Sequence, residues 1–235
     1  MKAADVMVTN VIAVGADATV QQVAEILLAN RISAVPVVGN DGELVGIISE
    51  GDLLRRSEID TERRRSGWLA LFLGNSGMAA DFVKMHGRKV ADLMTHEVVT
   101  ACPDTPLRDV ATLLEKNRIK RVPIVEAGKL VGIVSRANLV QALATARKPV
   151  KAGTATSDLL IREDIIARLS AESWTKAGRT NVIVHDGAVE LWGTVRSEAE
   201  KQAVRAAVEL TPGVRVVHNN LVVETLTSSL HLVAA

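Results

Sequence analysis

Aromatic residues are scarce in this sequence. Only 2% of its 235 residues are aromatic, and there is no tyrosine. A protein that stacks single-stranded nucleic acid on its surface needs several aromatic faces. The net charge of +1 gives no general field that would attract nucleic acid or an anionic membrane. We therefore expect no nucleic-acid partner.

Cysteine, export signals and long apolar runs are lacking as well. Cys102 is the single cysteine, which rules out an internal disulfide framework and suits a reducing compartment. Asp5 interrupts the apolar stretch that a secretory signal would need. No apolar run approaches the roughly 18–20 residues of a membrane-spanning helix. These features predict a soluble, cytoplasmic protein.

Signatures of catalysis and of metal binding are also missing. The five histidines and Cys102 have no metal-ligand spacing. The sequence contains no phosphate-binding loop, zinc-protease motif or nucleophile elbow. Because no nucleophile–base pair can be identified, we expect a protein that is not an enzyme and requires no cofactor.

What the sequence does contain is an internal repeat. LVGIISEGDLL at 44–54 returns as LVGIVSRANLV at 130–140, and NRISAVPVV at 30–38 returns as NRIKRVPIV at 117–125. The offset is 87 from Pro36 to Pro123 and 86 from Gly46 to Gly132, so the second copy has lost one residue in a turn. Such self-similarity indicates two copies of one structural unit.

Each copy predicts the order short strand, helix, strand, strand, helix. Residues 19–31 and 106–118 space their apolar side chains as a helix does. Two apolar runs joined by a glycine-containing turn then predict a hairpin. One copy has too little core of its own, and we therefore expect the two copies to pack together.

Ser49 and Asp52 lie at a corner where a strand is followed by a helix. The first turn of a helix offers unpaired N–H groups and a positive dipole end to a phosphate. The serine hydroxyl could donate to that phosphate, and the carboxylate could accept from two vicinal ribose hydroxyls. Ser-x-x-Asp is also close to a capping box, worth about 1 kcal/mol. The local pattern leaves both roles open, and they are compatible.

A proline strand lies across each predicted hairpin. Val35-Pro36 in the first copy and Val122-Pro123 in the second present an apolar strand with an interrupted N–H ladder. A flat base could lie against such a strand. We therefore count Val35, Pro36, Val122 and Pro123 among the candidate ligand-binding residues.

These residues together resemble a tandem pair of CBS (cystathionine-β-synthase) domains, over about residues 1–57 and 87–146. The resemblance lies in the helix, in the x-x-hydrophobic-Pro strand and in the G-h-h-S-x-x-D ending. It implies an α+β fold of two β-α-β-β-α repeats that associates as a homodimer. It also implies an adenine nucleotide (AMP, ADP or ATP) as a regulatory ligand between the repeats, with Ser49 near phosphate and Asp52 on the ribose.

The second copy departs from the family pattern, because Asn138 replaces the aspartate. An amide accepts through one oxygen only and donates through its nitrogen, so it should hold a ribose diol less well. We expect unequal clefts, with the Ser49/Asp52 site the better one. The cleft of Ser135 and Asn138 could still bind nucleotide, be empty or take another ligand.

Basic side chains must neutralise the phosphates of such a ligand. We predict Arg121, where the first copy has Ala34, and Arg136, beside Ser135, as phosphate contacts. Arg31 and Arg118 close the two long helices, and we expect them to serve as caps.

An insert at 58–86 separates the copies. Trp68, Leu71 and Phe72 form an apolar stripe at helical spacing. We expect this stripe to pack against the repeats or a second subunit rather than to enter a bilayer. The arginines at 55–65 alternate with acidic residues, which favours a solvated helical face over a phosphate or lipid contact.

A polar linker at 147–156 leads to a smaller unit at 157–225, and a tail at 226–235 ends the chain. The unit predicts helix, strand, strand, helix, strand, with a hairpin at Asp186-Gly187 and a capping box from Ser197 to Glu200. VELWGTVRSEAE and PGVRVVHNNLVV within it resemble a BON domain. That resemblance implies an αββαβ fold and a phospholipid or protein partner. Trp192 is either a surface anchor or a packing residue.

The combination of these units predicts a non-enzymatic regulator. In this hypothesis an adenine nucleotide binds between the CBS repeats and alters the arrangement of the dimer, the insert or the BON domain. The alternative is a ligand-independent scaffold, in which the BON domain recruits a protein partner or a membrane surface.

Overall fold

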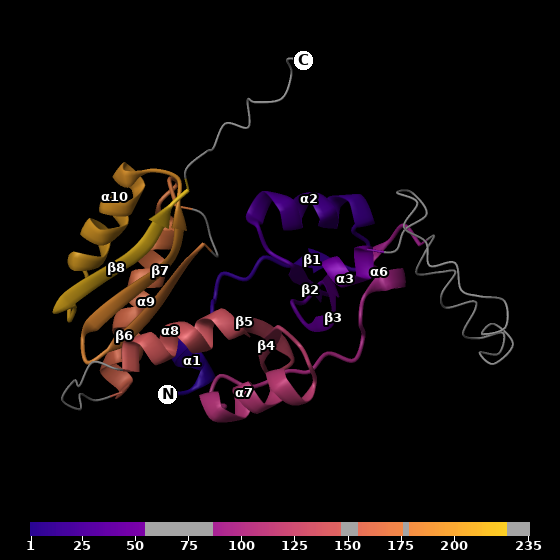
Figure 1. The fold of residues 1–235 in the computed structure, drawn as a ribbon, viewed down its shortest axis with the longest axis horizontal. Coiled ribbons are helices and arrows are strands. Elements are labelled where there is room, and N and C mark those ends of the chain that lie inside the picture. Colours follow the sequence, from indigo (N-terminus) through magenta and orange to yellow (C-terminus); the bar gives the residue numbers. More distant parts are fainter. Residues whose placement is uncertain (55–86, 147–154, 176–178, 225–235) are drawn as a thin grey trace, which may run out of the picture.

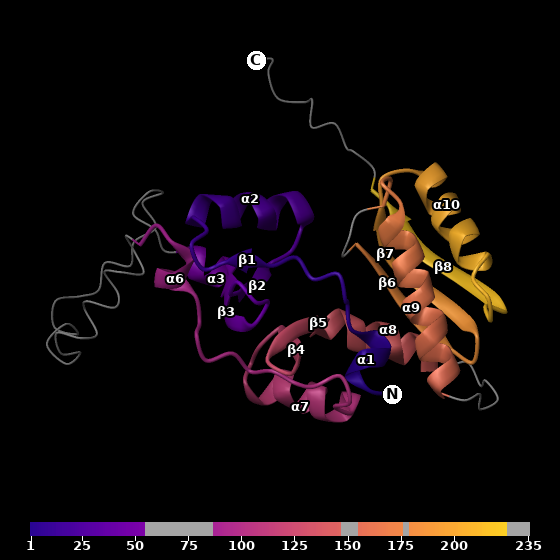
Figure 2. The same cartoon turned by 180° about the vertical axis from the view of Figure 1, so that it is seen from behind.

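The computed structural model describes residues 1–54, 87–146, 155–175 and 179–224. Two α/β repeats lie against each other, and the C-terminal domain lies beside the second (Figures 1 and 2). The predicted insert, with Trp68, Leu71 and Phe72, lies outside the described residues, as do residues 147–154 of the linker predicted at 147–156 and the tail predicted at 226–235. Residues 155 and 156 lie in a helix instead of a linker. The mixed α+β class that the sequence predicts is confirmed.

Repeat 1 is a three-stranded sheet covered by a helix. Strand β1 (Val14–Gly15) is parallel to β2 (Ala34–Val38), and β2 is antiparallel to β3 (Leu44–Ser49), with Pro36 opposite Ile47. Helix α2 (Val20–Asn30) begins with a capping box between Thr19 and Gln22. The short helix α3 (Glu50–Leu53) follows β3 directly. Apolar side chains of β2, β3 and α2 form the core between helix and sheet.

Repeat 2 has the same plan. Helix α7 (Leu107–Lys116) precedes β4 (Arg121–Glu126) and β5 (Lys129–Ser135), which pair with Pro123 opposite Ile133. Helix α8 (Arg136–Ala146) follows β5 as α3 follows β3. Ala101 forms an isolated parallel bridge with Ile124, in the place that β1 occupies in repeat 1. The predicted order of elements is therefore present in repeat 1, and in repeat 2 its first strand is reduced to this bridge.

The opening segments of the two copies are exchanged. Helix α1 (Ala3–Val6) and Met7 lie in the core of repeat 2, whereas helix α6 (Val90–Leu93) and Met94 lie in the core of repeat 1. Isolated bridges from Val8 to Ile133 and from Thr95 to Ile47 fix this arrangement. Neither repeat is therefore a compact unit by itself.

The glycine of the repeated LVGI phrase makes this exchange possible. A Cβ atom at Gly46 would lie 2.5 Å from Sδ of Met94, and a Cβ at Gly132 would lie 2.5 Å from Sδ of Met7. Both glycines are buried. The exchanged methionines occupy the space that a side chain would need, which explains why glycine stands at this place in both copies.

The C-terminal domain is a three-stranded sheet with two helices on one face. Strand β6 (Thr180–His185) is antiparallel to β7 (Ala188–Val195), and β7 is parallel to β8 (Val216–Val223). Helices α9 (Ala155–Ala171) and α10 (Glu198–Glu209) bury Ile165, Val204 and Val208 against this sheet. The predicted hairpin is present. Asp186 and Gly187 both have positive φ angles, of 56° and 70°, as a type I′ turn requires.

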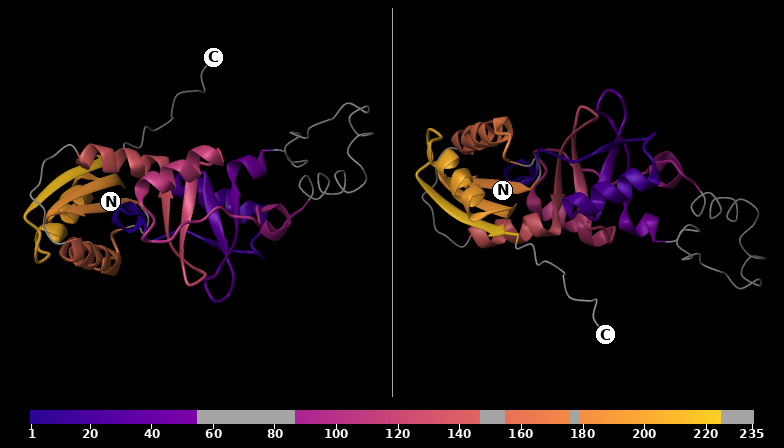
Figure 3. Two further views of the ribbon diagram at one scale, coloured as in Figure 1. Left: turned by 90° about the horizontal axis from the view of Figure 1, so that it is seen from below. Right: turned by 90° about the horizontal axis from the view of Figure 1, so that it is seen from above.

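The other face of this sheet rests on repeat 2. Ile183 belongs to the apolar core of repeat 2, and the half-buried Trp192 packs against the same core. Figure 3 shows helix α1 between the C-terminal domain and repeat 2. Of the two roles that the sequence left open for Trp192, the structure supports packing. None of the helices in the described part of the chain combines the length and the apolar character that a membrane span requires.

Candidate functional site: two clefts between the repeats

The repeats enclose two clefts, which we name the Ser49 cleft and the Ser135 cleft. The Ser49 cleft has a volume of about 370 Å³ and lies at the start of α3, against the segment 95–99 and residues 118–121. The Ser135 cleft has about 310 Å³ and lies at the start of α8, against the segment 8–12 and residues 31–34. Both volumes are within the range usual for small-molecule sites.

Ser49 and Asp52 are brought together as predicted by their spacing. The backbone N–H and the hydroxyl of Ser49 both donate to Oδ2 of Asp52, each at 2.8 Å. This pair closes the corner between β3 and α3, which is the capping role. Oδ1 of Asp52 has no hydrogen-bond partner among the described residues. One carboxylate oxygen thus serves the corner, and the other can accept from a ligand.

Ser135 and Asn138 form the matching corner in repeat 2. The N–H and the hydroxyl of Ser135 both donate to Oδ1 of Asn138 at 2.7 Å. Nδ2 of Asn138 donates to Oε1 of Gln141 at 3.3 Å. Asn138 is 5% exposed, and its nitrogen takes the place of the oxygen that Asp52 leaves open. The amide therefore retains the corner but replaces an acceptor by a donor.

Arg121 stands in the wall that the two clefts share. It lines both clefts, together with Ser33, Ala34 and Glu50. Its guanidinium donates to the carbonyl of Ala34 at 2.9 Å and to the hydroxyl of Ser33. Burial lowers the pKa of Arg121 from its ordinary value, and the carboxylate of Glu50 opposes that shift. A half-buried positive charge thus lies within reach of either cleft.

Four of the predicted residues do not line the clefts. The side chains of Val35 and Val122 are completely buried, because alternate residues of β2 and β4 face the repeat cores. Pro36 faces the Ser135 cleft, but Pro123 lines neither cleft. Arg136 is exposed and donates to the carbonyl of Ile119 at 3.1 Å, outside both linings. The structure therefore places Val35 and Val122 in the cores rather than in a site.

Several lining residues are ones that the sequence did not indicate. Asn10 lines the Ser135 cleft, and Glu97 and Lys120 line the Ser49 cleft. Asn10 and Glu97 lie in the exchanged segments, and no local sequence pattern predicts that exchange. Arg31 was expected as a cap only. It does end α2, in a left-handed conformation with a φ of 52°, and it also lines the Ser135 cleft.

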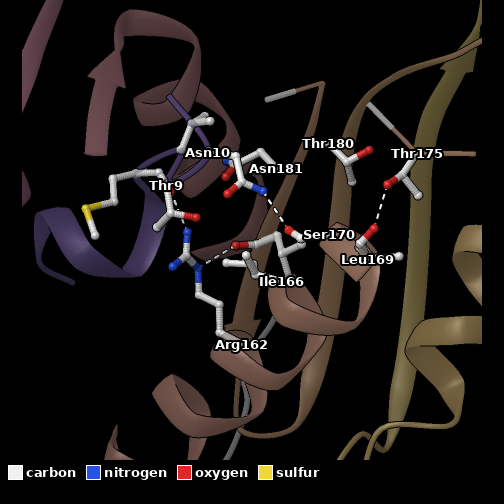
Figure 4. A pocket seen from close by; sticks show the side chains of 12 residues that line it. Thr9, Asn10, Arg162, Ile166, Leu169, Ser170, Thr175, Thr180 and Asn181 are labelled. Atoms are coloured by element: carbon white, nitrogen blue, oxygen red, sulfur yellow. Dashed lines mark hydrogen bonds between the residues drawn. The ribbon is translucent and has the colours of Figure 1, made fainter. Parts of the chain in front are cut away.

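A third cavity lies between the repeats and the C-terminal domain (Figure 4). It is lined by residues 7–10, by the end of α9 and by the start of β6, and it holds about 40 Å³. That volume fits a few water molecules and is far too small for a nucleotide. Arg162 of α9 is 4% exposed and donates to the carbonyls of Met7 and Val182 beside this cavity.

Comparison with known protein families agrees with this architecture. The CBS domain model matches residues 3–58 and 90–145, and the BON domain model matches residues 157–225. The chain therefore belongs to the CBS-domain proteins, with two CBS repeats followed by a BON domain.

Similar proteins match about half of this chain. "Uncharacterized protein MJ1426" of Methanocaldococcus jannaschii is 38% identical over 125 residues, which are 48% of this chain and 74% of that protein. The chloroplastic CBS domain-containing protein CBSX1 of Arabidopsis thaliana is 35% identical over 130 residues, covering 53% of this chain and 55% of that protein. This chain thus spans about half the length of the plant relative.

A solved structure supports the fold of the repeats. The crystal structure of CBSX2 in complex with AMP superimposes with a TM-score of 0.55 and 29% identity. It covers 63% of this chain and 99% of that chain. CBSX2 is a protein of Arabidopsis thaliana.

Proposed function

We propose that this chain is a non-enzymatic sensor of adenine nucleotides of the AMP, ADP and ATP type. The nucleotide binds first in the Ser49 cleft, and nucleotide binding between the repeats is signalled to the BON domain. The observation that carries this proposal is the open oxygen of Asp52 in a cleft of about 370 Å³. A cap alone needs only one carboxylate oxygen, which leaves the second to accept from ribose hydroxyls.

The charges around the Ser49 cleft suit an anionic ligand that carries hydroxyl groups. Arg118, Lys120 and Arg121 lie along one side, and the carboxylates of the lining belong to Glu50, Asp52 and Glu97. The basic groups can bind phosphate, whereas the carboxylates can accept from hydroxyl or amino groups. A similar protein, CBSX2, has been crystallised with AMP. This similarity supports AMP as the first ligand to test.

The remaining parts of the proposal concern the assembly. We expect a homodimer through the CBS repeats and a protein or phospholipid partner for the BON domain, in the cytoplasm. Trp192 is packed against repeat 2, so the BON domain does not offer that indole as a lipid anchor in this arrangement. A partner must bind another part of its surface.

Calorimetry on the full chain tests nucleotide binding. AMP, ADP and ATP are titrated separately, and the melting temperature is followed in parallel. At a ligand concentration 100 times its dissociation constant, binding should stabilise the protein by about 2.7 kcal/mol. If none of the three gives heat of binding or a rise in melting temperature, the proposed function is wrong.

A further inference from the structure

The BON domain is fixed to the CBS repeats by buried polar contacts. Arg162 of α9 donates through Nε to the carbonyl of Val182 in its own domain, at 2.8 Å, and through Nη2 to the carbonyl of Met7 in the exchanged segment. Burial lowers the pKa of Arg162 to about 10, so its guanidinium remains charged at neutral pH. A buried charge of this kind is tolerable only while its hydrogen bonds are made.

Three residues that line the Ser135 cleft are also tied to the BON domain. Nδ2 of Asn10 donates to the hydroxyl of Ser170 at 2.8 Å, as Figure 4 shows. Nη1 of Arg31 lies 3.3 Å from Oε1 of Glu224. Asn138 is tied indirectly, through Gln141, as described next.

Gln141 joins the corner of the Ser135 cleft to strand β6. Its Oε1 accepts from Nδ2 of Asn138 at 3.3 Å and from Nδ2 of Asn181 at 2.8 Å. Asn181 is 6% exposed and also donates to the carbonyl of Val6. This relay requires a donor at position 138. A carboxylate there would face the oxygen of Gln141, and turning that amide would place its NH₂ group against the NH₂ group of Asn181.

The Ser49 cleft lacks such ties. Across the described part of the chain, no hydrogen bond or ion pair joins a side chain that lines only that cleft to residues 157–224. The amide of Asn138 therefore coincides with the cleft that contacts the BON domain, and the carboxylate of Asp52 with the cleft that does not. The replacement of aspartate by asparagine at position 138 therefore has a role of its own, which is to connect the Ser135 cleft with the BON domain.

We propose that the docked BON domain completes the Ser135 cleft, so that nucleotide binding in this cleft and docking of the BON domain strengthen each other. The inference rests on the proposed nucleotide-binding function. Asn10, Arg31 and Asn138 each have further N–H groups beyond those that the BON domain and Gln141 use. A phosphate or ribose can therefore bind to side chains that docking has already ordered. By linkage, the nucleotide tightens docking by the same factor.

The test removes two of the three ties, those through Ser170 and Gln141, without changing the lining of the cleft. The pair of Arg31 and Glu224 stays in place. Gln141→Met and Ser170→Ala are combined in the full chain, because neither residue lines the Ser135 cleft. AMP is titrated by calorimetry into this double variant and into the wild type. Both are also measured with Asp52→Asn added. The binding event that this change weakens is the one in the Ser49 cleft. The matched control is Ser173→Ala, an exposed serine beyond the end of α9.

We expect the double variant to lose about fivefold or more in AMP affinity at the Ser135 cleft and to keep the affinity of the Ser49 cleft. A second measurement is amide hydrogen exchange. AMP should slow exchange in β6 of the wild type and should leave β6 of the double variant unaffected.

The outcomes separate this inference from the proposed function. If the wild type binds none of the nucleotides, both are wrong. If the wild type binds AMP only in the Ser49 cleft, the inference is wrong and the proposed function stands. The same holds if the double variant retains its Ser135 affinity within twofold, or if both clefts weaken equally.

Discussion

The corners of the Ser49 cleft and the Ser135 cleft come from the same repeated phrase of sequence, and the side chains of Asp52 and Asn138 in them differ at one atom. In both corners, one side-chain oxygen accepts from the N–H and the hydroxyl of the preceding serine. Beyond this oxygen, Asp52 carries a second acceptor, whereas Asn138 carries a donor that is bonded to Gln141. Aspartate and asparagine both supply the oxygen that accepts from the serine, at 2.7–2.8 Å, so this position could change chemistry while the corner was preserved.

The comparison therefore divides each corner into two parts. The part that holds strand to helix is identical in the two copies, and it accounts for the recurring serine. The second polar atom differs: Oδ1 of Asp52 can accept from a ligand, whereas Nδ2 of Asn138 donates to Gln141, which accepts from Asn181 of the BON domain. Substitutions in the two repeats and in the BON domain test this division.

The largest effect is expected where the BON domain is fixed. Arg162→Met leaves the carbonyls of Met7 and Val182 without their charged donor. We expect the free energy of unfolding to fall by about 3 kcal/mol, measured by chemical denaturation. Arg168→Met, an exposed change on the same helix, should have almost no effect. Equal losses in the two variants would show that the buried guanidinium does not hold the domain.

The next effect separates the cap from the ligand site in the Ser49 cleft. Asp52→Asn creates the corner that Ser135 and Asn138 already form with hydrogen bonds of 2.7 Å. The melting temperature should therefore change little. Nucleotide affinity should fall about 10- to 100-fold, because a charged acceptor is lost. Calorimetry measures the affinity, and Asp41→Asn in the exposed turn is the control. A lower melting temperature with unchanged affinity would leave Asp52 a capping role only.

A smaller effect is expected where the two copies are alike. Gly46→Ala and Gly132→Ala each place a Cβ atom against a methionine of the exchanged segments. Overpacking should destabilise each variant by about 1 kcal/mol, the low end of its range, because a thioether can turn aside. Gly42→Ala, where a Cβ meets no atom within 4 Å, tests the cost of backbone strain alone. Clearly unequal losses at Gly46 and Gly132 would show that the repeats are less equivalent than their packing indicates.

The smallest effect is expected on the stability of the protein at acidic pH. A hydrogen bond from Arg179 holds the pKa of Glu224 below its ordinary value. The stability from this pairing is therefore present above the unfolded pKa and is lost as the pH falls through the folded pKa. Glu224→Gln should weaken the protein slightly at neutral pH and should match the wild type in acid. Thermal unfolding across this pH range measures the difference, and parallel curves at all pH values would exclude the carboxylate as its cause.

The sequence predicted the repeats and both corners because these depend on local spacing. Ser-x-x-Asp places its two side chains at one helix start wherever it follows a strand, and the Asp186-Gly187 turn specifies its hairpin in the same way. The order of elements in all three units follows from such patterns. Periodicity also separates buried from exposed faces, although the inward direction of Val35 and Val122 was not recognised.

What the sequence did not reveal depends on contacts between distant residues. Arg162 lies beside Ile161 on a helix whose apolar face was recognised, yet its partner Met7 is 155 residues away. Asn10 reaches its cleft only because the opening segments are exchanged. The available signal for Arg162 is an arginine beside the apolar face of its helix. This signal does not identify Met7 as the partner.

The exchange of α1 and α6 has a consequence for anyone who divides this chain. A fragment that ends at residue 54 keeps the hairpin of repeat 1 but carries the opening helix that belongs in the core of repeat 2. It lacks Met94, which packs against Gly46 in the full chain. Each half would be incomplete alone and complementary to the other. Co-expressing the two halves should therefore reconstitute a native-like complex where either half by itself would be insoluble.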